Sequence, residues 1–185
     1  ISARRWKNWA LVVLYFTSFG GFIALTAWLP TYWRSLYGVT VVMSGVLTAV
    51  YAISTSLLRV AGGLVSDRWG GEKTLVISLF VMLAGSILMT QASLLPVAVA
   101  ACLMLALGMG FSNAAVFKLV PQAVPDAVGG AAGWVGGLGA LGGFVIPPLL
   151  GAIVASRGQA GYAQGFYIFV ALALAAIVLA FVLIK

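Results

Sequence analysis

One arginine lies inside an apolar stretch where a charge is costly. Arg59 comes eight residues before Asp67, so about 12 Å of helix rise separates it from the first charged residue of the following loop. A charge at that depth in a membrane costs at least about 2.5–3.5 kcal/mol, and no acidic residue lies in the same stretch. A guanidinium matches two oxygens of a planar anion at once. Arg59 therefore either reaches back to the cytoplasmic headgroups or binds an anion.

Small residues share the helix side that carries Arg59, because side chains three or four positions apart lie on one face. This side is predicted to line a polar cavity, and its members are Ser44, Thr48, Ala52, Thr55, Gly62 and Gly63.

A second stretch is dense in glycine and contains two adjacent prolines. Small residues let membrane helices approach closely, and the run also permits a bend or a close approach of backbone to substrate. Tight helix packing alone explains the pattern equally well. The residues are Gly129, Gly130, Gly133, Gly136, Gly137, Gly139, Gly142, Gly143, Pro147, Pro148 and Gly151.

A third feature is a charged, glycine-rich loop over residues 63–73. Asp67, Arg68, Glu72 and Lys73 crowd this turn. An acid at the end of one helix with basic partners across a short turn could form a latch that opens when the helices move. The simpler interpretation is a charged cytoplasmic loop.

The composition of the chain predicts that membrane-spanning helices position these residues. The chain has 185 residues, of which 63% are hydrophobic and 7% are charged. Soluble domains carry roughly 25% charged residues, so an integral membrane protein is predicted. Continuous apolar runs favour helices over alternating barrel strands. Six spans of about 20 residues are expected, with breaks at residues 29–30, 67–71, 93–96, 121–125 and 157–158; the spans are 9–28, 41–65, 74–90, 95–119, 128–155 and 162–184.

Basic residues predict the orientation of this all-α, polytopic bundle. By the positive-inside rule, both termini and the second loop are expected to be cytoplasmic. The net charge of +7 is therefore an orientation signal, and no nucleic-acid partner is predicted. The cytoplasmic set is Arg4, Arg5, Lys7, Arg68, Lys73, Lys118 and Lys185, against Arg34 and Arg157 on the opposite side.

The residue types exclude most enzyme chemistry. The chain has no histidine, which removes imidazole bases and Ser-His triads. Cys102 is its only cysteine and cannot form an internal disulfide. A membrane enzyme would need a Ser-His pair, an Asp dyad or a metal cluster inside the spans. We therefore expect no catalytic residues, no metal and no cofactor.

The loop over residues 63–73 resembles the signature of the major facilitator superfamily, G-x-x-x-D-R-x-G-x-x-[KR]. Gly63, Asp67, Arg68, Gly70 and Lys73 match it. That family builds twelve helices from two six-helix halves around a midplane site. The resemblance implies that this chain is one half of such a transporter and that the other six helices are missing from it.

Four further stretches resemble the C-terminal half of the nitrate/nitrite porters. They are 15–22, 59–63, 108–118 and 136–147, corresponding to the seventh, eighth, tenth and eleventh helices. The resemblance implies that Arg59 is one of two arginines that clamp the anion, that Tyr15 and Phe19 shape the pocket and that Asn113 adds a polar contact. Considered without the family, Tyr15, Phe19 and Asn113 are better explained by ordinary packing.

The same resemblance implies that Gly139, Gly142 and Gly143 form a moving, close-packed helix. Ser112 and Ala114 flank Asn113 where the family often has glycine.

These observations together favour a multi-pass transporter of the cytoplasmic membrane that moves nitrate or nitrite by alternating access. Because no Asp, Glu or His lies in any span, nitrate/nitrite exchange is favoured over proton coupling through this half. Coupling through the missing half or through the anion itself stays open. The alternatives are a superfamily half for another solute, such as a sugar acid or a drug, and a membrane subunit that only binds partners.

Overall fold

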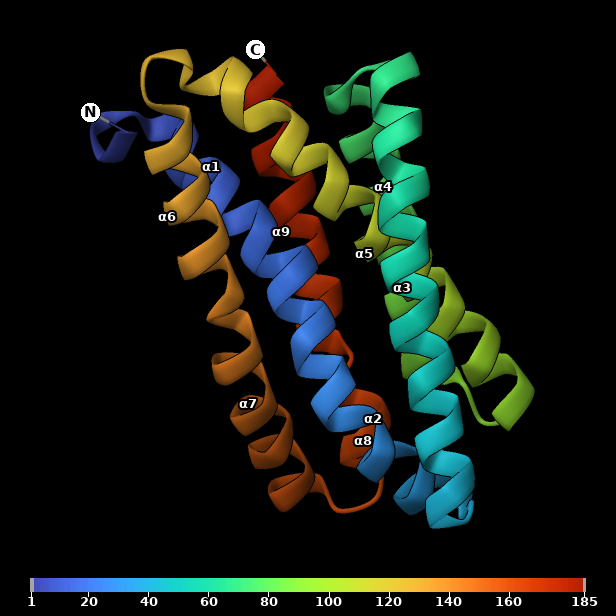
Figure 1. The fold of residues 1–185 in the computed structure, drawn as a ribbon. Helices are drawn as coiled ribbons and strands as arrows, with labels where there is room; N and C mark the ends of the chain where they lie inside the picture. The colour runs from blue at the N-terminus through green and yellow to red at the C-terminus, as the bar shows by residue number, and fades with distance from the viewer. Residues whose placement is uncertain (1, 185) are drawn as a thin grey trace.

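The computed structural model describes residues 2–184, and every regular element in that range is helical (Figure 1). Six helical segments are long and apolar enough to cross a membrane, which confirms the six predicted spans. In chain order the elements are the 3₁₀ helix η1 (Ser2–Arg4), α1 (Trp6–Tyr15), the π-helical turn η2 (Phe16–Gly20), α2 (Gly21–Tyr37), α3 (Val41–Trp69), α4 (Gly71–Gln91), α5 (Leu95–Ala123), the 3₁₀ helix η3 (Pro125–Ala127), α6 (Val128–Ala140), α7 (Gly142–Arg157), α8 (Ala160–Gln164) and α9 (Tyr167–Ile184).

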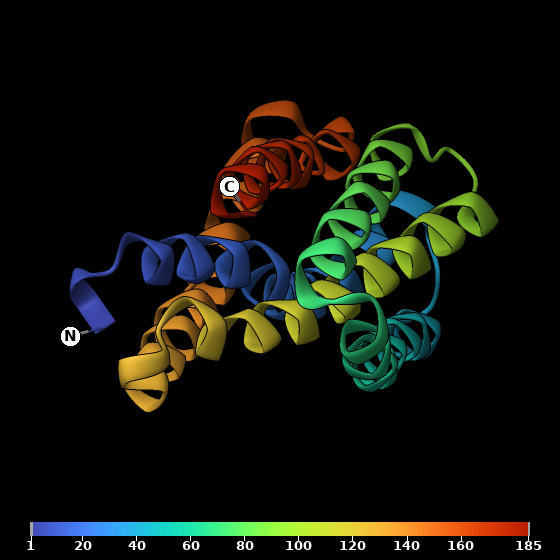
Figure 2. The same ribbon diagram turned by 90° about the horizontal axis from the view of Figure 1, so that it is seen from above.

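Two helices, α5 and α1, each pack between two others. Figure 2 shows α5 passing between α3 and α4, and α1 passing between α6 and α9, and both arrangements are direct contacts. The first span, α1–η2–α2, is the most enclosed, because 61% of its most apolar 18-residue stretch is buried inside the bundle. By contrast, α3 and the α6–α7 span are only 22% buried. These two spans therefore present most of their side chains outside this six-helix bundle.

Two helices continue through prolines that were expected to end them. Pro30 lies inside α2, which runs on to Tyr37, and Pro121 lies inside α5. The predicted break at residues 29–30 is therefore wrong, whereas α5 ends at Ala123, within the predicted break at residues 121–125. A proline removes only one helix hydrogen bond, and in lipid no water replaces the remaining backbone bonds. The first span instead ends at Gly38, whose φ of 64° is left-handed.

The predicted helix over 128–155 is two helices. The backbone is interrupted at Leu141, between α6 and α7. Pro147 and Pro148 both lie inside α7, beyond the interruption. The two ends of the described chain lie at the same end of the bundle (Figure 1). Lys185, which entered the orientation argument, lies outside the described residues.

Candidate functional site

Two glycines bring the helix of Arg59 against α5 without intervening side chains. A Cβ atom on Gly62 would lie 2.7 Å from the Cα of Phe111. A Cβ atom on Gly110 would lie 2.8 Å from the carbonyl oxygen of Thr55 and 3.1 Å from the backbone nitrogen of Arg59. Because α3 and α5 touch backbone to backbone here, Arg59 and Asn113 are held on facing helices at close range.

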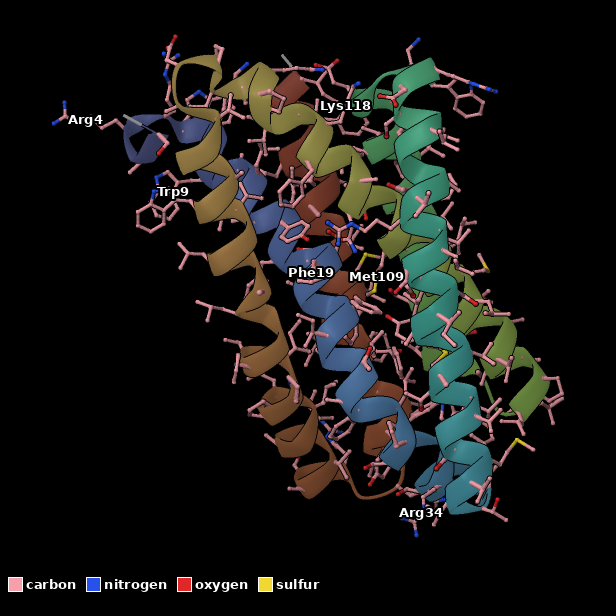
Figure 3. The ribbon with its side chains drawn as sticks, in the orientation of Figure 1. Arg4, Trp9, Phe19, Arg34, Met109 and Lys118 are labelled. Atoms are coloured by element: carbon pink, nitrogen blue, oxygen red, sulfur yellow. The ribbon has the colours of Figure 1, made fainter. Side chains whose placement is uncertain are left out.

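Arg59 lines a cavity of about 150 Å³ between the first span, α3 and α5. The lining residues are Phe19, Phe22, Thr55, Ser56, Arg59 and Asn113. Phe19 lies about midway along the bundle, with Lys118 and Arg4 at one end and Arg34 at the other (Figure 3). The cavity is therefore deep in the membrane-spanning part of the protein.

Aromatic rings flank the guanidinium. The Cζ atom of Arg59 lies 5.6 Å from the centre of the Phe19 ring and 5.8 Å from that of Phe117. Both distances are within the range of a cation–π interaction. Such contacts stabilise a cation without neutralising it. In residues 2–184 neither of the two ion pairs includes Arg59, so its charge has no acidic partner there.

A buried amide faces the same cavity. Asn113 is 2% exposed, and its Oδ1 atom has no hydrogen-bond partner within the described chain. The hydroxyls of Thr55 and Ser56 donate to the carbonyls of Tyr51 and Ala52. An unpartnered buried amide oxygen is costly unless a hydrogen-bond donor such as water completes its hydrogen bonds.

The polar face predicted along α3 lines the cavity only in part. Thr55 does so, whereas Ser44 and Thr48 are buried against neighbouring helices. Their hydroxyls bond to carbonyls of their own helix, Val41 and Ser44 respectively. Ser44 and Thr48 therefore do not line this cavity. The reason is that a hydroxyl can satisfy itself on the preceding turn and then pack as a small side chain.

Tyr15 supports the cavity from behind. Its ring stacks on Phe19, with centroids 4.8 Å apart, and meets Phe117 edge-on at 4.9 Å. Tyr15 is 3% exposed and does not line the cavity. It therefore buttresses the two rings that contact Arg59.

The three predicted glycines pack against the first span rather than the cavity. A Cβ atom on Gly139 would lie 2.7 Å from the Tyr15 ring, and one on Gly142 2.7 Å from the Cα of Gly20. One on Gly143 would lie 2.5 Å from Ile23. A role for these glycines in substrate contact stays a prediction, because none of them is among the cavity-lining residues.

Several site residues were not predicted from the sequence. Phe22, Ser56 and Phe117 are near Arg59, and the π-helical turn η2 carries Phe19. Phe22 and Phe117 follow Phe19 and Asn113 by three and four residues, so helical spacing could have found them. The π-turn had only a weak signal, the adjacent Thr17-Ser18 and Gly20-Gly21 pairs.

The charged loop makes a contact different from the one expected. Asp67, at the end of α3, forms an ion pair with Lys118 of α5. Neither ion pair in residues 2–184 includes Arg68 or Lys73, the basic residues expected to form the latch. Gly70 turns the chain with a φ of 90°, and Gly63 has no atom within 4 Å of a Cβ position.

The fold and the match to known sequences identify the class of protein. The family profile of the Major Facilitator Superfamily matches residues 11–185, so this chain belongs to that superfamily of membrane transporters. The structure is similar to that of a bacterial homologue of the human lysosomal transporter Spinster in an inward-facing, occupied conformation. Its TM-score is 0.72 at 16% identity, covering 96% of this chain and 48% of the other.

The curated relatives carry more specific names. The chain is 33% identical over 171 residues to the nitrite extrusion protein of Bacillus subtilis, covering 92% of this chain and 43% of the relative. It is 32% identical over 162 residues to the "Probable nitrate/nitrite antiporter NarK1" of Thermus thermophilus, covering 77% and 37%. It is 34% identical over 181 residues to the "Probable nitrate/nitrite transporter NarK2" of Mycobacterium tuberculosis, covering 95% of this chain and 45% of the relative. The chain thus spans less than half the length of these relatives.

Proposed function

We propose that this chain is the C-terminal six-helix half of a transporter that moves nitrate or nitrite across the cytoplasmic membrane. The transporter works by alternating access, with both ends of this half on the cytoplasmic side. The names of the curated relatives support the choice of substrate. Their greater length supports a second half outside this sequence.

The observation that carries the proposal is the environment of Arg59. Its guanidinium lines a deep cavity beside two aromatic rings and a buried amide, and no acid in residues 2–184 pairs with it. Interactions of this kind position a cation but leave its charge uncompensated. A planar anion supplies both the charge and the two oxygens that a guanidinium binds side by side.

The absence of proton carriers in this half supports exchange. The three acidic residues Asp67, Glu72 and Asp126 lie at helix ends or in a connection, and the chain has no histidine. With a second arginine contributed by the other half, the empty site would hold two like charges that oppose closure. A bound anion removes that repulsion, so the loaded protein changes conformation more readily than the empty one. That difference favours nitrate/nitrite exchange.

The test uses the full-length protein reconstituted in proteoliposomes loaded with nitrite. Uptake of external nitrate is expected for the wild type and is expected to be lost in Arg59→Ala and Arg59→Lys, because an ammonium does not reproduce the paired donors. Arg157→Ala is the matched control, since Arg157 is an exposed arginine at the end of α7.

Two results would contradict the proposal, and a third would refute only the exchange mechanism. Retention of nitrate uptake in Arg59→Ala would mean that Arg59 only reaches the headgroups. Transport of a different solute with no response to nitrate would favour another substrate class. A strict requirement for a proton gradient would refute simple exchange while leaving nitrate transport in place.

A further inference from the structure

An irregular turn lies within the first span beside the cavity. In η2 the backbone N–H of Gly21 donates to the carbonyl of Phe16, five residues back. The hydroxyls of Thr17 and Ser18 donate to the carbonyls of Val13 and Leu14 at 3.1 and 3.0 Å. A π-turn holds one extra residue, so side chains beyond it are rotated by about 100° from their positions in an uninterrupted α-helix.

This turn is in close contact with the chain at the interruption between α6 and α7. A Cβ atom on Gly142 would lie 2.7 Å from the Cα of Gly20 and 2.8 Å from the carbonyl oxygen of Phe16. That oxygen accepts the π-type bond from Gly21. A Cβ atom on Gly20 would lie 2.7 Å from the carbonyl oxygen of Gly139. At Gly20 and Gly142 the two irregular segments are therefore in contact through backbone atoms.

The same turn carries the aromatic side of the cavity. Phe19 is inside the turn and lies 5.6 Å from Arg59, and Tyr15 immediately precedes the turn and stacks on Phe19. The rotation of the turn thus determines where the Phe19 ring lies relative to the guanidinium and to the Tyr15 ring. In a regular α-helix the residues after Phe16 would rotate, and the Phe19 ring would no longer lie at this angle to Arg59.

We propose that Gly20 and Gly142 are positioning residues for the anion site. Their contact preserves the π-turn, and the π-turn holds Phe19 against Arg59. Neither glycine lines the cavity, so both act through the aromatic rings. This inference rests on the proposed function and adds to it the residues that shape the site from a neighbouring helix.

The experiment measures nitrate uptake kinetics of the full-length protein carrying Gly142→Ala or Gly20→Ala. The KM for nitrate is expected to rise about tenfold, equivalent to about 1.4 kcal/mol, with a smaller change in the maximal rate. Gly161→Ala is the matched steric control, because its Cβ would lie 2.6 Å from the Cα of Val154, between α7 and α8 and away from the site. Gly133→Ala is the open control, with no atom within 4 Å.

Two results would overturn the inference. One is an unchanged KM in a folded Gly142→Ala protein, and the other is an equal rise in Gly161→Ala, which would mean that overpacking anywhere weakens binding. If Gly142→Ala yields no folded protein, Ser18→Ala replaces it, because it removes a hydroxyl bond from the turn without adding an atom. An unchanged KM in Ser18→Ala would then refute the role of the turn.

The failure of this inference can be told apart from failure of the proposed function. If Arg59→Ala abolishes nitrate uptake and Gly142→Ala does not change it, only the positioning role is lost. If the wild type does not transport nitrate, a structure of the Gly142→Ala protein decides whether Gly142 preserves the π-turn. The inference predicts that the bond from Gly21 to Phe16 is lost and that Phe19 moves from Arg59, and a retained π-turn would overturn it.

Discussion

The adjacent glycines Gly62 and Gly63 offer a direct test of the packing that positions Arg59. They are next to each other on α3, yet a Cβ atom on Gly62 would lie 2.7 Å from the Cα of Phe111, whereas one on Gly63 would meet nothing within 4 Å. Ordinary contacts of this kind are 3.4–4 Å. In Gly62→Ala, α3 and α5 must therefore separate by roughly 1 Å, because a close-packed backbone cannot yield otherwise.

The magnitude follows from the difference between the two substitutions. Each replaces glycine by alanine in the middle of a helix, and each gains about 1 kcal/mol of helix propensity. Only Gly62→Ala adds overpacking, which costs typically about 1–3 kcal/mol. We therefore expect Gly62→Ala to be less stable than Gly63→Ala by about 1–3 kcal/mol. Nitrate affinity should also fall in Gly62→Ala, because Arg59 moves away from Asn113.

The assay is thermal unfolding of the full-length protein in detergent, with and without nitrate. Gly45→Ala is a second comparison in the same helix, since its Cβ position is also open. Gly62→Ala should unfold several degrees below both comparison variants and gain less stability from nitrate. If Gly62→Ala and Gly63→Ala unfold together, the close contact of α3 with α5 is not the feature that limits stability, and the reasoning fails.

Two further predictions concern side-chain interactions. Phe19→Leu and Phe117→Leu should each lower nitrate affinity about fivefold, roughly 1 kcal/mol, because each removes a ring that holds the half-buried guanidinium in place for the anion. Phe181→Leu on the outer side of α9 should leave the affinity unchanged. An equal loss in Phe181→Leu would contradict the assignment. Asp67→Asn and Lys118→Gln should show a coupling energy below about 1 kcal/mol in a double-mutant cycle, because the side chains of Asp67 and Lys118 are 60% and 42% exposed. A larger coupling energy that persists at high salt would contradict the conclusion that this ion pair is weak and screened by solvent.

The sequence predicts the six spans well because membrane helices are marked by long apolar runs. It predicts their ends less well. Pro30 and Leu141 illustrate why. Proline is a helix breaker where water can replace lost hydrogen bonds, and inside lipid α2 continues through Pro30. The interruption at Leu141 has no proline of its own, and the glycines on either side of it, Gly139 and Gly142, lie close against the first span.

The part of the site that depends on charge could be predicted from the sequence. The part that depends on contacts between helices could not. Arg59 stands out in the sequence as a cation inside an apolar run, and the resemblance to the nitrate/nitrite porters added Phe19 and Asn113. Nothing in the residue types distinguishes Gly62 from Gly63, and only a weak signal marks η2 as a π-turn. Both depend on which backbone atoms a neighbouring helix brings close, and that information lies in the tertiary structure.

Close backbone contacts fix the spacing of the helices around Arg59. Gly62 meets Phe111, Gly110 meets Thr55, and on the other side Gly20 meets Gly142. Because no flexible side chain separates these helices, a small slide of one helix changes the size of the cavity directly. A bound anion that favours one cavity size therefore favours one helix arrangement. On the proposed function, this is how occupancy by a small anion could be linked to movement of the helices around it.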